Sequence, residues 1–280
     1  MIKHPVSNLL TLATLGVLAL FFLVPLALMV VVSFYKPDTM AFYKVAFVWD
    51  NYQKFFSGFY YNVSIRSLWS AGLAAVLVTC IAFPAVLVIA DLSRRWQMFW
   101  MILMLALMCL SEVIVGFAWM IIFSENAGIP RLLEFLGLWD NPRSLAPSFG
   151  AMITGLVTLG FSIVALMLYP QVARRDRSIE EAARTLGTSP FMVFFKVILP
   201  TFRTGLIAAT MTMFVYLLGV FVIPTMLGKP QNWTMTVMIQ DRAVTDFNMP
   251  LGAALAVIML IVTGLILIAT MLFARNRSAV

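Results

Sequence analysis

A polar segment interrupts the apolar chain and reads, from Ser178 to Pro190, Ser-Ile-Glu-Glu-Ala-Ala-Arg-Thr-Leu-Gly-Thr-Ser-Pro. Ser178 and Glu181 have the S-x-x-E spacing of a capping box, in which each side chain accepts a hydrogen bond from a free backbone N–H at the start of a helix. Glu180 and Glu181 also place negative charge at the positive end of the helix dipole. Gly187 stands where a helix commonly ends in a left-handed turn. The segment therefore predicts a short helix that begins at Ser178 and stops before Gly187.

The residues that follow predict a second helix. Ser189 is a suitable N-cap, and Pro190 fits the first helical position. The stretch from Phe191 to Leu199 is apolar, so we expect it to lie along the membrane face before Pro200 leads into the next apolar run. An ordinary helix-turn-helix connection would show the same pattern, so the capping chemistry alone does not assign a function.

Composition places most of the chain in lipid. Its 280 residues are 62% hydrophobic and 11% charged, whereas soluble domains are about half apolar and about a quarter charged. A soluble fold could not remove so many apolar side chains from water. We expect residues 1–280 to form a single membrane domain. The net charge of +7 does not indicate nucleic acid, because the basic residues stand in short segments between apolar runs.

Six apolar runs predict an all-α integral membrane protein with six transmembrane helices. Each run is long enough to cross the roughly 30 Å hydrocarbon core, which takes roughly 20 residues. The apolar core of the first run is too long for a signal peptide, so we expect it to be a retained helix. The predicted spans lie near Leu9–Phe34, Ser67–Ala90, Met98–Phe123, Phe149–Tyr169, Thr204–Met226 and Leu251–Phe273.

Positive charge predicts the orientation of these spans. The N-terminal tail, the even-numbered loops and the C-terminal tail carry Lys and Arg more densely than the three longer loops on the other side. By the positive-inside rule the denser side is cytoplasmic, so we expect both termini in the cytoplasm. The residues on that side are Lys3, Arg94, Arg95, Arg174, Arg175, Arg177, Arg184, Lys196, Arg203, Arg275 and Arg277.

The polar segment resembles the E-A-A-x-x-x-G-x9-I-x-L-P signature of permeases in binding-protein-dependent ABC importers. Val197 stands where the signature has Ile. The matching residues are Glu181, Ala182, Ala183, Gly187, Leu199 and Pro200.

This resemblance implies a type I ABC importer permease fold, in which the matching loop, residues 171–203, holds a coupling helix that sits in a groove of the cytoplasmic ATPase. It also implies partners: two ATP-binding subunits, a second permease that we expect to be a different chain, and a periplasmic binding protein, all at the bacterial inner membrane. The implied ATPase-coupling residues are Ser178, Glu181, Ala182, Ala183, Gly187 and Pro200.

Three further runs are similar to permeases of spermidine/putrescine importers. Leu218–Gly228 resembles L-G-E-F-V-I-P-x-L-L-G, with Val220 in place of the Glu. Asn248–Leu255 resembles the run that opens the last span, and Ser111–Gly116 resembles an element of the companion permease. The resemblance implies a polyamine-like solute, and relatives of this subgroup also carry opines, phosphonates, thiamine or ferric ion.

Glu112 is the ionisable residue that lies well inside a predicted span. A charge there costs about 2.5–3.5 kcal/mol on insertion scales, so we expect the carboxyl group to face the bundle interior or water. It either lines the pathway of a cationic or polar solute or serves as a structural acid. Trp119 and Tyr216 are candidates to line the same pathway, although single aromatic residues in spans usually serve packing.

The sequence offers no catalytic machinery of its own. It lacks the G-x-x-x-x-G-K-[ST] phosphate loop, so we expect no cofactor in this chain, with ATP and Mg bound by the partner ATPase. It also has no Ser-His-Asp set, Cys-His pair or cluster of metal ligands, which argues against a membrane enzyme. A secondary transporter would usually show more intramembrane charges and an internal repeat. A structural scaffold is the third alternative, and it gives no purpose to the capped helix.

Overall fold

The computed structural model describes residues 5–38 and 42–277, and these fall into two compact units. The first unit combines the chain up to Ser64 with Met238–Leu265. The second combines Ile65–Val237 with the chain from Ile266 on. Two long helices, α3 (Phe59–Asp91) and α14 (Met249–Arg277), run through both units. The prediction of a single membrane domain over residues 1–280 stays a prediction.

The first unit begins with α1 (Pro5–Ser33), an apolar helix long enough to span a membrane. None of the residues in its most apolar 18-residue window is buried within the chain. An apolar helix that its own chain leaves uncovered needs lipid or another subunit around it, because water would not solvate this surface.

The aromatic segment after α1 packs against the end of that helix. It contains the antiparallel strands β1 (Lys36–Asp38) and β2 (Phe42–Lys44) and the short helix α2 (Asp50–Phe55). The ring of Phe34 stacks on Phe47 at a centroid distance of 5.0 Å. The buried Asn51 amide donates hydrogen bonds of 2.9 Å to the carbonyl groups of Ser33 and Tyr35. These contacts satisfy the free carbonyl groups at the end of α1.

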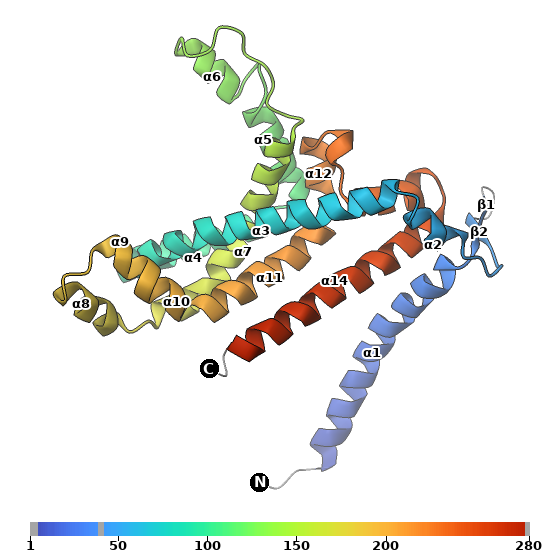
Figure 1. The fold of residues 1–280 in the computed structure, drawn as a ribbon, viewed down its shortest axis with the longest axis horizontal. Helices are drawn as coiled ribbons and strands as arrows, with labels where there is room; N and C mark the ends of the chain where they lie inside the picture. The colour runs from blue at the N-terminus through green and yellow to red at the C-terminus, as the bar shows by residue number, and fades with distance from the viewer. Residues whose placement is uncertain (1–4, 39–41, 278–280) are drawn as a thin grey trace. The chain divides into compact units, whose positions relative to one another are not determined.

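The second unit is built around α7 (Phe149–Ala173). This helix contacts α4 (Arg94–Met108), α5 (Glu112–Ile122), α11 (Arg203–Gly219) and α12 (Val222–Leu227), as Figure 1 shows. Gly155 allows α7 to approach α12 closely, because an added Cβ would lie 2.7 Å from Leu227. The largest fully buried side chains on these elements are Met152, Leu156, Leu168, Met213, Leu217, Ile223 and Leu227.

Four helices are individually long and apolar enough to cross a membrane, and two bent helix pairs raise the possible number to six. The four belong to α1, α3, α7 and α14, which match the first, second, fourth and sixth predicted spans. The all-α membrane fold is therefore confirmed, while the number of six depends on counting each bent pair as one span.

The third predicted span, residues 98–123, is not one continuous helix. The segment consists of α4 and α5, which meet at an angle of 98°. The side chain of Ser111 accepts a hydrogen bond from the backbone N–H of Val113, so this residue caps a new helix inside the apolar run. Glu112 then places negative charge at the helix start. A polar capping pair therefore breaks the span, without proline or glycine.

The fifth predicted span, residues 204–226, also departs from one straight helix. It contains α11 and α12, separated by an extended residue at Val220. Pro224 lies in the first turn of α12. In a continuous helix Pro224 would have no N–H to donate to the Val220 carbonyl group, and its ring would clash with that group, which explains why α11 ends before Val220. At its N-terminal end, α11 makes an angle of 72° with the preceding helical segment, Pro190–Thr201.

The remaining elements are short and connect these helices. They are α6 (Ile129–Phe135), α8 (Arg177–Thr185), α9 (Pro190–Val193), the π-helix η1 (Phe194–Ile198), α10 (Leu199–Thr201), the 3₁₀ helix η2 (Pro230–Asn232), α13 (Met235–Gln240) and the π-helix η3 (Asp241–Thr245).

Candidate functional site: a capped helical hairpin and a pair of broken helices

The polar segment forms the predicted helix, but the predicted cap is wrong. α8 starts at Arg177, and its N-cap is Asp176. The Asp176 carboxylate accepts a hydrogen bond of 2.9 Å from the backbone N–H of Ser178. The side chain and backbone of Ser178 both hold the pKa of Asp176 below its usual value. An ionised carboxylate is both a good cap and a favourable charge for the helix dipole, so the helix starts before Ser178.

The other end of α8 has the predicted left-handed turn. Gly187 has a φ of +81°. Its N–H bonds to the carbonyl oxygen of Arg184 at 2.9 Å, and the N–H of Thr188 bonds to that of Ala183 at 3.2 Å. These two bonds form a Schellman motif, which satisfies carbonyl groups that the helix leaves free. The role of Gly187 in coupling stays a prediction.

The second helix of the hairpin starts as predicted. Ser189 caps α9 by accepting a hydrogen bond from the Met192 N–H, and Pro190 occupies the first turn. The helix then widens into a π-helix at Phe194–Ile198, directly before Pro200. Because Pro200 has no N–H and its ring would clash with the carbonyl group four residues earlier, the wider turn accommodates it.

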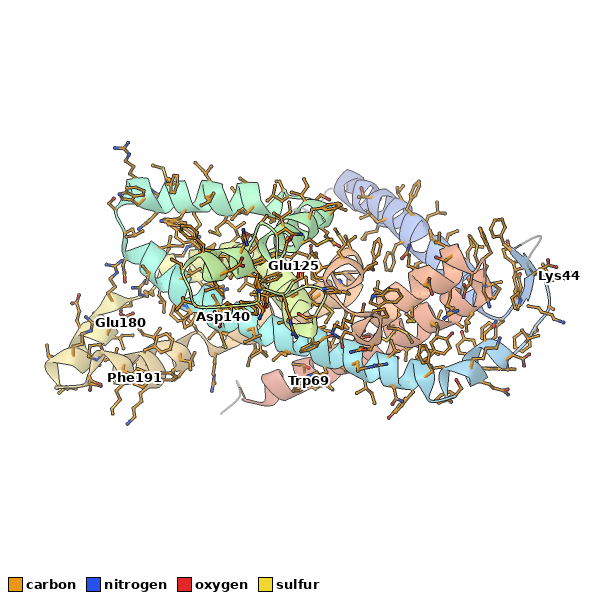
Figure 2. The ribbon with its side chains drawn as sticks, turned by 90° about the horizontal axis from the view of Figure 1, so that it is seen from above. Lys44, Trp69, Glu125, Asp140, Glu180 and Phe191 are labelled. Atoms are coloured by element: carbon orange, nitrogen blue, oxygen red, sulfur yellow. The ribbon has the colours of Figure 1, made fainter. Side chains whose placement is uncertain are left out.

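The hairpin of α8 and α9 leaves its surface uncovered. No residue of α8 is buried, and Glu181 and Ala182 are exposed. Leu186 is 85% exposed and Phe191 is 74% exposed. Phe191 is labelled on this hairpin in Figure 2. Large apolar side chains beside a polar helix mark a surface that fits a protein partner.

The two broken spans meet at Glu112. α5 and α12 are in contact, and the Glu112 carboxylate accepts a hydrogen bond from the backbone N–H of Val222, the first residue of α12. The carboxylate oxygen Oε2 is buried and has no hydrogen-bond partner among the described residues. The acid therefore faces the interior of the unit, with one oxygen atom engaged by the helix start and one without a partner.

The two aromatic residues predicted for the pathway, Tyr216 and Trp119, have different surroundings. The Tyr216 hydroxyl interacts electrostatically with Glu112. Tyr216 also lines an apolar cavity of about 640 Å³ beside α11, together with Thr212 and Leu267. Trp119 instead donates a hydrogen bond of 3.0 Å to Thr158 on α7 and stacks on Phe123. A role of Glu112, Tyr216 and Trp119 in a solute pathway stays a prediction.

The polar connection before α8 contains functional candidates that the sequence reasoning missed. Arg175 is 7% exposed at its side chain and is paired with Asp91 and Glu180. Charged residues at the boundary between a span and a polar loop could have pointed to Arg175. Only the fold, however, shows that Asp91 and Glu180 lie beside it. Within the described residues, no group of three or more His, Cys, Asp or Glu side chains could hold a metal ion.

Comparison with known families places the chain among transport proteins. Residues 82–278 match the model of a family described as the binding-protein-dependent transport system inner membrane component. This match covers both broken spans and the whole capped hairpin.

Individual relatives extend the match to nearly the whole chain. The spermidine/putrescine transport system permease protein PotB of Salmonella typhimurium is 26% identical over 262 residues, covering 94% of this chain and 91% of that protein. The sulfoquinovosyl glycerol transport system permease protein SmoG of Agrobacterium fabrum is 26% identical over 260 residues, covering 86% of this chain and 81% of that protein.

A solved structure shares the fold. It is a bacterial alginate ABC transporter in complex with an alginate pentasaccharide-bound periplasmic protein, with a TM-score of 0.77 and 14% sequence identity. The match covers 97% of this chain and 94% of the matched chain.

Proposed function

The chain belongs to the family of binding-protein-dependent transport system inner membrane components, and from this premise we propose that it passes a small, polyamine-like cation across the membrane. It is a permease subunit of an ABC importer and not an enzyme, since ATP hydrolysis in such importers belongs to separate ATPase subunits. The proposed substrate class is supported by the similarity to a spermidine/putrescine permease over 94% of the chain.

The hairpin of α8 and α9 is the proposed contact with the ATPase. Its uncovered helix and the exposed side chains of Leu186 and Phe191 support this role. A rigid, capped helix is suited to the task, because an applied force moves it without unwinding it. The proposed coupling residues are Ser178, Glu181, Ala182, Ala183, Gly187 and Pro200.

The remaining partners follow from the proposed importer. Two copies of an ATPase subunit bind ATP and Mg, so this chain itself holds no cofactor. A second permease of different sequence completes the pathway, and a periplasmic binding protein delivers the solute. A binding protein is present in the solved alginate transporter complex, which has the same permease fold. In the bacterial inner membrane, α8 and both chain termini lie on the cytoplasmic side.

Glu112 and Tyr216 are the proposed pathway residues. The unpartnered carboxylate oxygen of Glu112 attracts a cation that has shed part of its water, and the nearby Tyr216 hydroxyl supplies a second polar group. The attraction must stay weak, because a solute held tightly at one site could not leave it. Trp119, which donates a hydrogen bond to Thr158, is the third proposed pathway residue.

A different polar solute is the second candidate. The permease SmoG, named for sulfoquinovosyl glycerol, has the same 26% identity to this chain. Val220, which stands where the resembling run of spermidine/putrescine permeases has Glu, also fits a less cationic solute.

Uptake of labelled solutes separates the two candidates. The chain, its partner permease, its ATPase and its binding protein are expressed in cells that lack polyamine uptake. We expect ATP-dependent accumulation of labelled spermidine or putrescine, and none when the ATPase is inactivated. Accumulation of a sulfonated glycoside without spermidine or putrescine would overturn the polyamine proposal and leave the importer function in place.

A further inference from the structure

Arg175 lies in the short connection between a span and the exposed helix. α7 ends at Ala173 and α8 begins at Arg177. The Arg175 side chain is only 7% exposed. Its Nη2 atom lies 2.6 Å from Oδ1 of Asp91, and its Nε atom lies 2.9 Å from Oε1 of Glu180. One guanidinium group thus bridges two carboxylates on two different helices, which the rigid fork of an arginine suits better than the single ammonium of a lysine.

The two carboxylates belong to elements far apart in the sequence. Asp91 is the last residue of α3, and Glu180 lies in the first half of α8. Arg177 adds a second link, because its Nη2 atom lies 2.8 Å from Asp91 and donates to the Ala90 carbonyl oxygen at 3.1 Å. Cations are favourable at the C-terminal end of α3, where the helix leaves carbonyl groups free. The start of α8 is therefore attached to the ends of two long helices.

The neighbouring glutamates of α8 have different surroundings. The Glu180 side chain is 14% exposed and lines a cavity of about 230 Å³ with Arg175, Ile179 and Phe202. Glu181 is exposed. Figure 2 labels Glu180 at the hairpin. Glu180 thus contacts other residues of this chain, whereas Glu181 is accessible to a partner.

From these contacts we infer that Arg175 is a positioning residue that fixes α8 to the ends of α3 and α7, so that a displacement of α8 moves both spans. This inference rests on the proposed function, because it needs an ATPase to displace α8. Without Arg175, Glu180 loses its ion pair, and among the ion pairs recorded for the described residues α8 keeps only the link of Arg177 to Asp91, so the exposed helix is held to the spans less firmly. The Glu180 carboxylate is only 14% exposed, so removing the guanidinium would leave its charge poorly solvated and without that partner.

Hydrogen exchange on the assembled importer tests the structural part of this inference. In Arg175→Ala, we expect the backbone N–H groups of α8 to exchange about ten-fold faster than in the wild type, because the helix opens more often. Arg174→Ala is the matched control. This exposed residue is adjacent and forms no ion pair that the structure records within the described residues. Exchange in the core of α7 should stay unchanged in both variants.

Solute uptake per ATP hydrolysed tests the functional part. With spermidine as the probe, Arg175→Ala should lower this ratio about ten-fold while the ATPase still co-purifies. Arg175→Lys should restore it in part, since an ammonium reaches one carboxylate well but not both. The double variant Arg175→Ala/Glu180→Gln should be no worse than Arg175→Ala, because the two residues act through one contact.

Several results would overturn the inference. Unchanged exchange of α8 in Arg175→Ala would mean that the ion pairs do not hold the helix. Faster exchange with an unchanged ratio of uptake to ATP hydrolysis would mean that the position of α8 does not determine coupling. Failure of the proposed function is distinguishable, because the wild-type complex would then show no ATP-driven spermidine uptake before any variant is compared.

Discussion

At Gly187 the backbone adopts a left-handed conformation that is unfavourable for residues with a Cβ atom. Its φ is +81°, and no heavy atom lies within 4 Å of the position that an added Cβ would take. Any cost of substitution therefore comes from the backbone conformation and not from a steric clash with neighbouring residues. For an L-residue that cost is about 1–2 kcal/mol, and it is largest for β-branched side chains.

Gly187→Val should therefore uncouple ATP hydrolysis from uptake, by opening the turn that ends α8. Gly187→Asn is the matched control, because asparagine tolerates the left-handed conformation and should keep most of the coupling. Substrate-stimulated ATPase activity and uptake are measured together for both variants. Equal, normal activity of the two variants would show that the turn is not needed.

Asp176 should make the start of α8 sensitive to acid. Its pKa is held below the ordinary value of 3.8 by Ser178, so its stabilising effect is complete above that value and is lost as the pH falls through the lowered pKa. A nitroxide label at residue 184, with Cys80 and Cys109 replaced, should gain mobility only in this acid range. In Asp176→Asn the same step should be absent. A step of equal size in both proteins would assign the transition to another group.

Single residues of the hairpin illustrate what the sequence can and cannot predict. The left-handed turn at Gly187 and the cap at Ser189 follow from local chemistry and are confirmed. The cap at Ser178 is wrong, because two capping residues stand near each other and the ionised Asp176 prevails. The different surroundings of Glu180 and Glu181 depend on Arg175 and Asp91, and no local pattern joins residues so distant along the chain.

At the level of the elements, the apolar runs predict where lipid is but not how the helices bend. A hydropathy profile averages over all residues of a span. The single polar residue Ser111 therefore did not indicate that a new helix starts within the third run. Pro224 lay in the fifth run as a known source of kinks, and the structure places the break just before it. The two breaks lie against each other, because Glu112 bonds to the start of α12. That pairing required the three-dimensional fold.

Two substitutions of Glu112 separate its structural and transport roles. Glu112→Gln keeps an oxygen atom that accepts the Val222 hydrogen bond but removes the negative charge. Glu112→Ala removes both. We expect Glu112→Gln to assemble normally and to lose cation uptake, and Glu112→Ala to destabilise the junction by about 1–3 kcal/mol as well.

Thermal unfolding of the purified complex and uptake of labelled spermidine provide the two measurements. Full uptake by Glu112→Gln would leave the carboxylate with a structural role. Loss of assembly in Glu112→Gln would indicate that its charge holds α5 and α12 together.

At the scale of the whole molecule, the chain leaves much apolar surface uncovered. The window of α1 has none of its residues buried, and that of α14 has 33% buried. The window of α7, in contrast, is 50% buried. An apolar helix that its own chain leaves uncovered can face lipid or another subunit. Composition predicted the membrane location, but only the structure distinguishes the covered helices from the uncovered ones.

The orientation of this chain in the membrane is the last prediction, and it rests on the positive charges around the hairpin. Arg174, Arg177 and Arg184 lie on the same side of the membrane as α8, and basic residues near spans favour the cytoplasm. The termini themselves, including Lys3, lie outside the described residues. A cytoplasm-active reporter fused after Val280 should therefore be active, and a periplasm-active reporter should be silent. As an internal control, a cysteine at Asp140 should react with an impermeant thiol reagent in intact cells, while a cysteine at Ser178 should react only after the cells are opened. The reverse labelling pattern would place α8 outside the cell, where no ATPase could reach it.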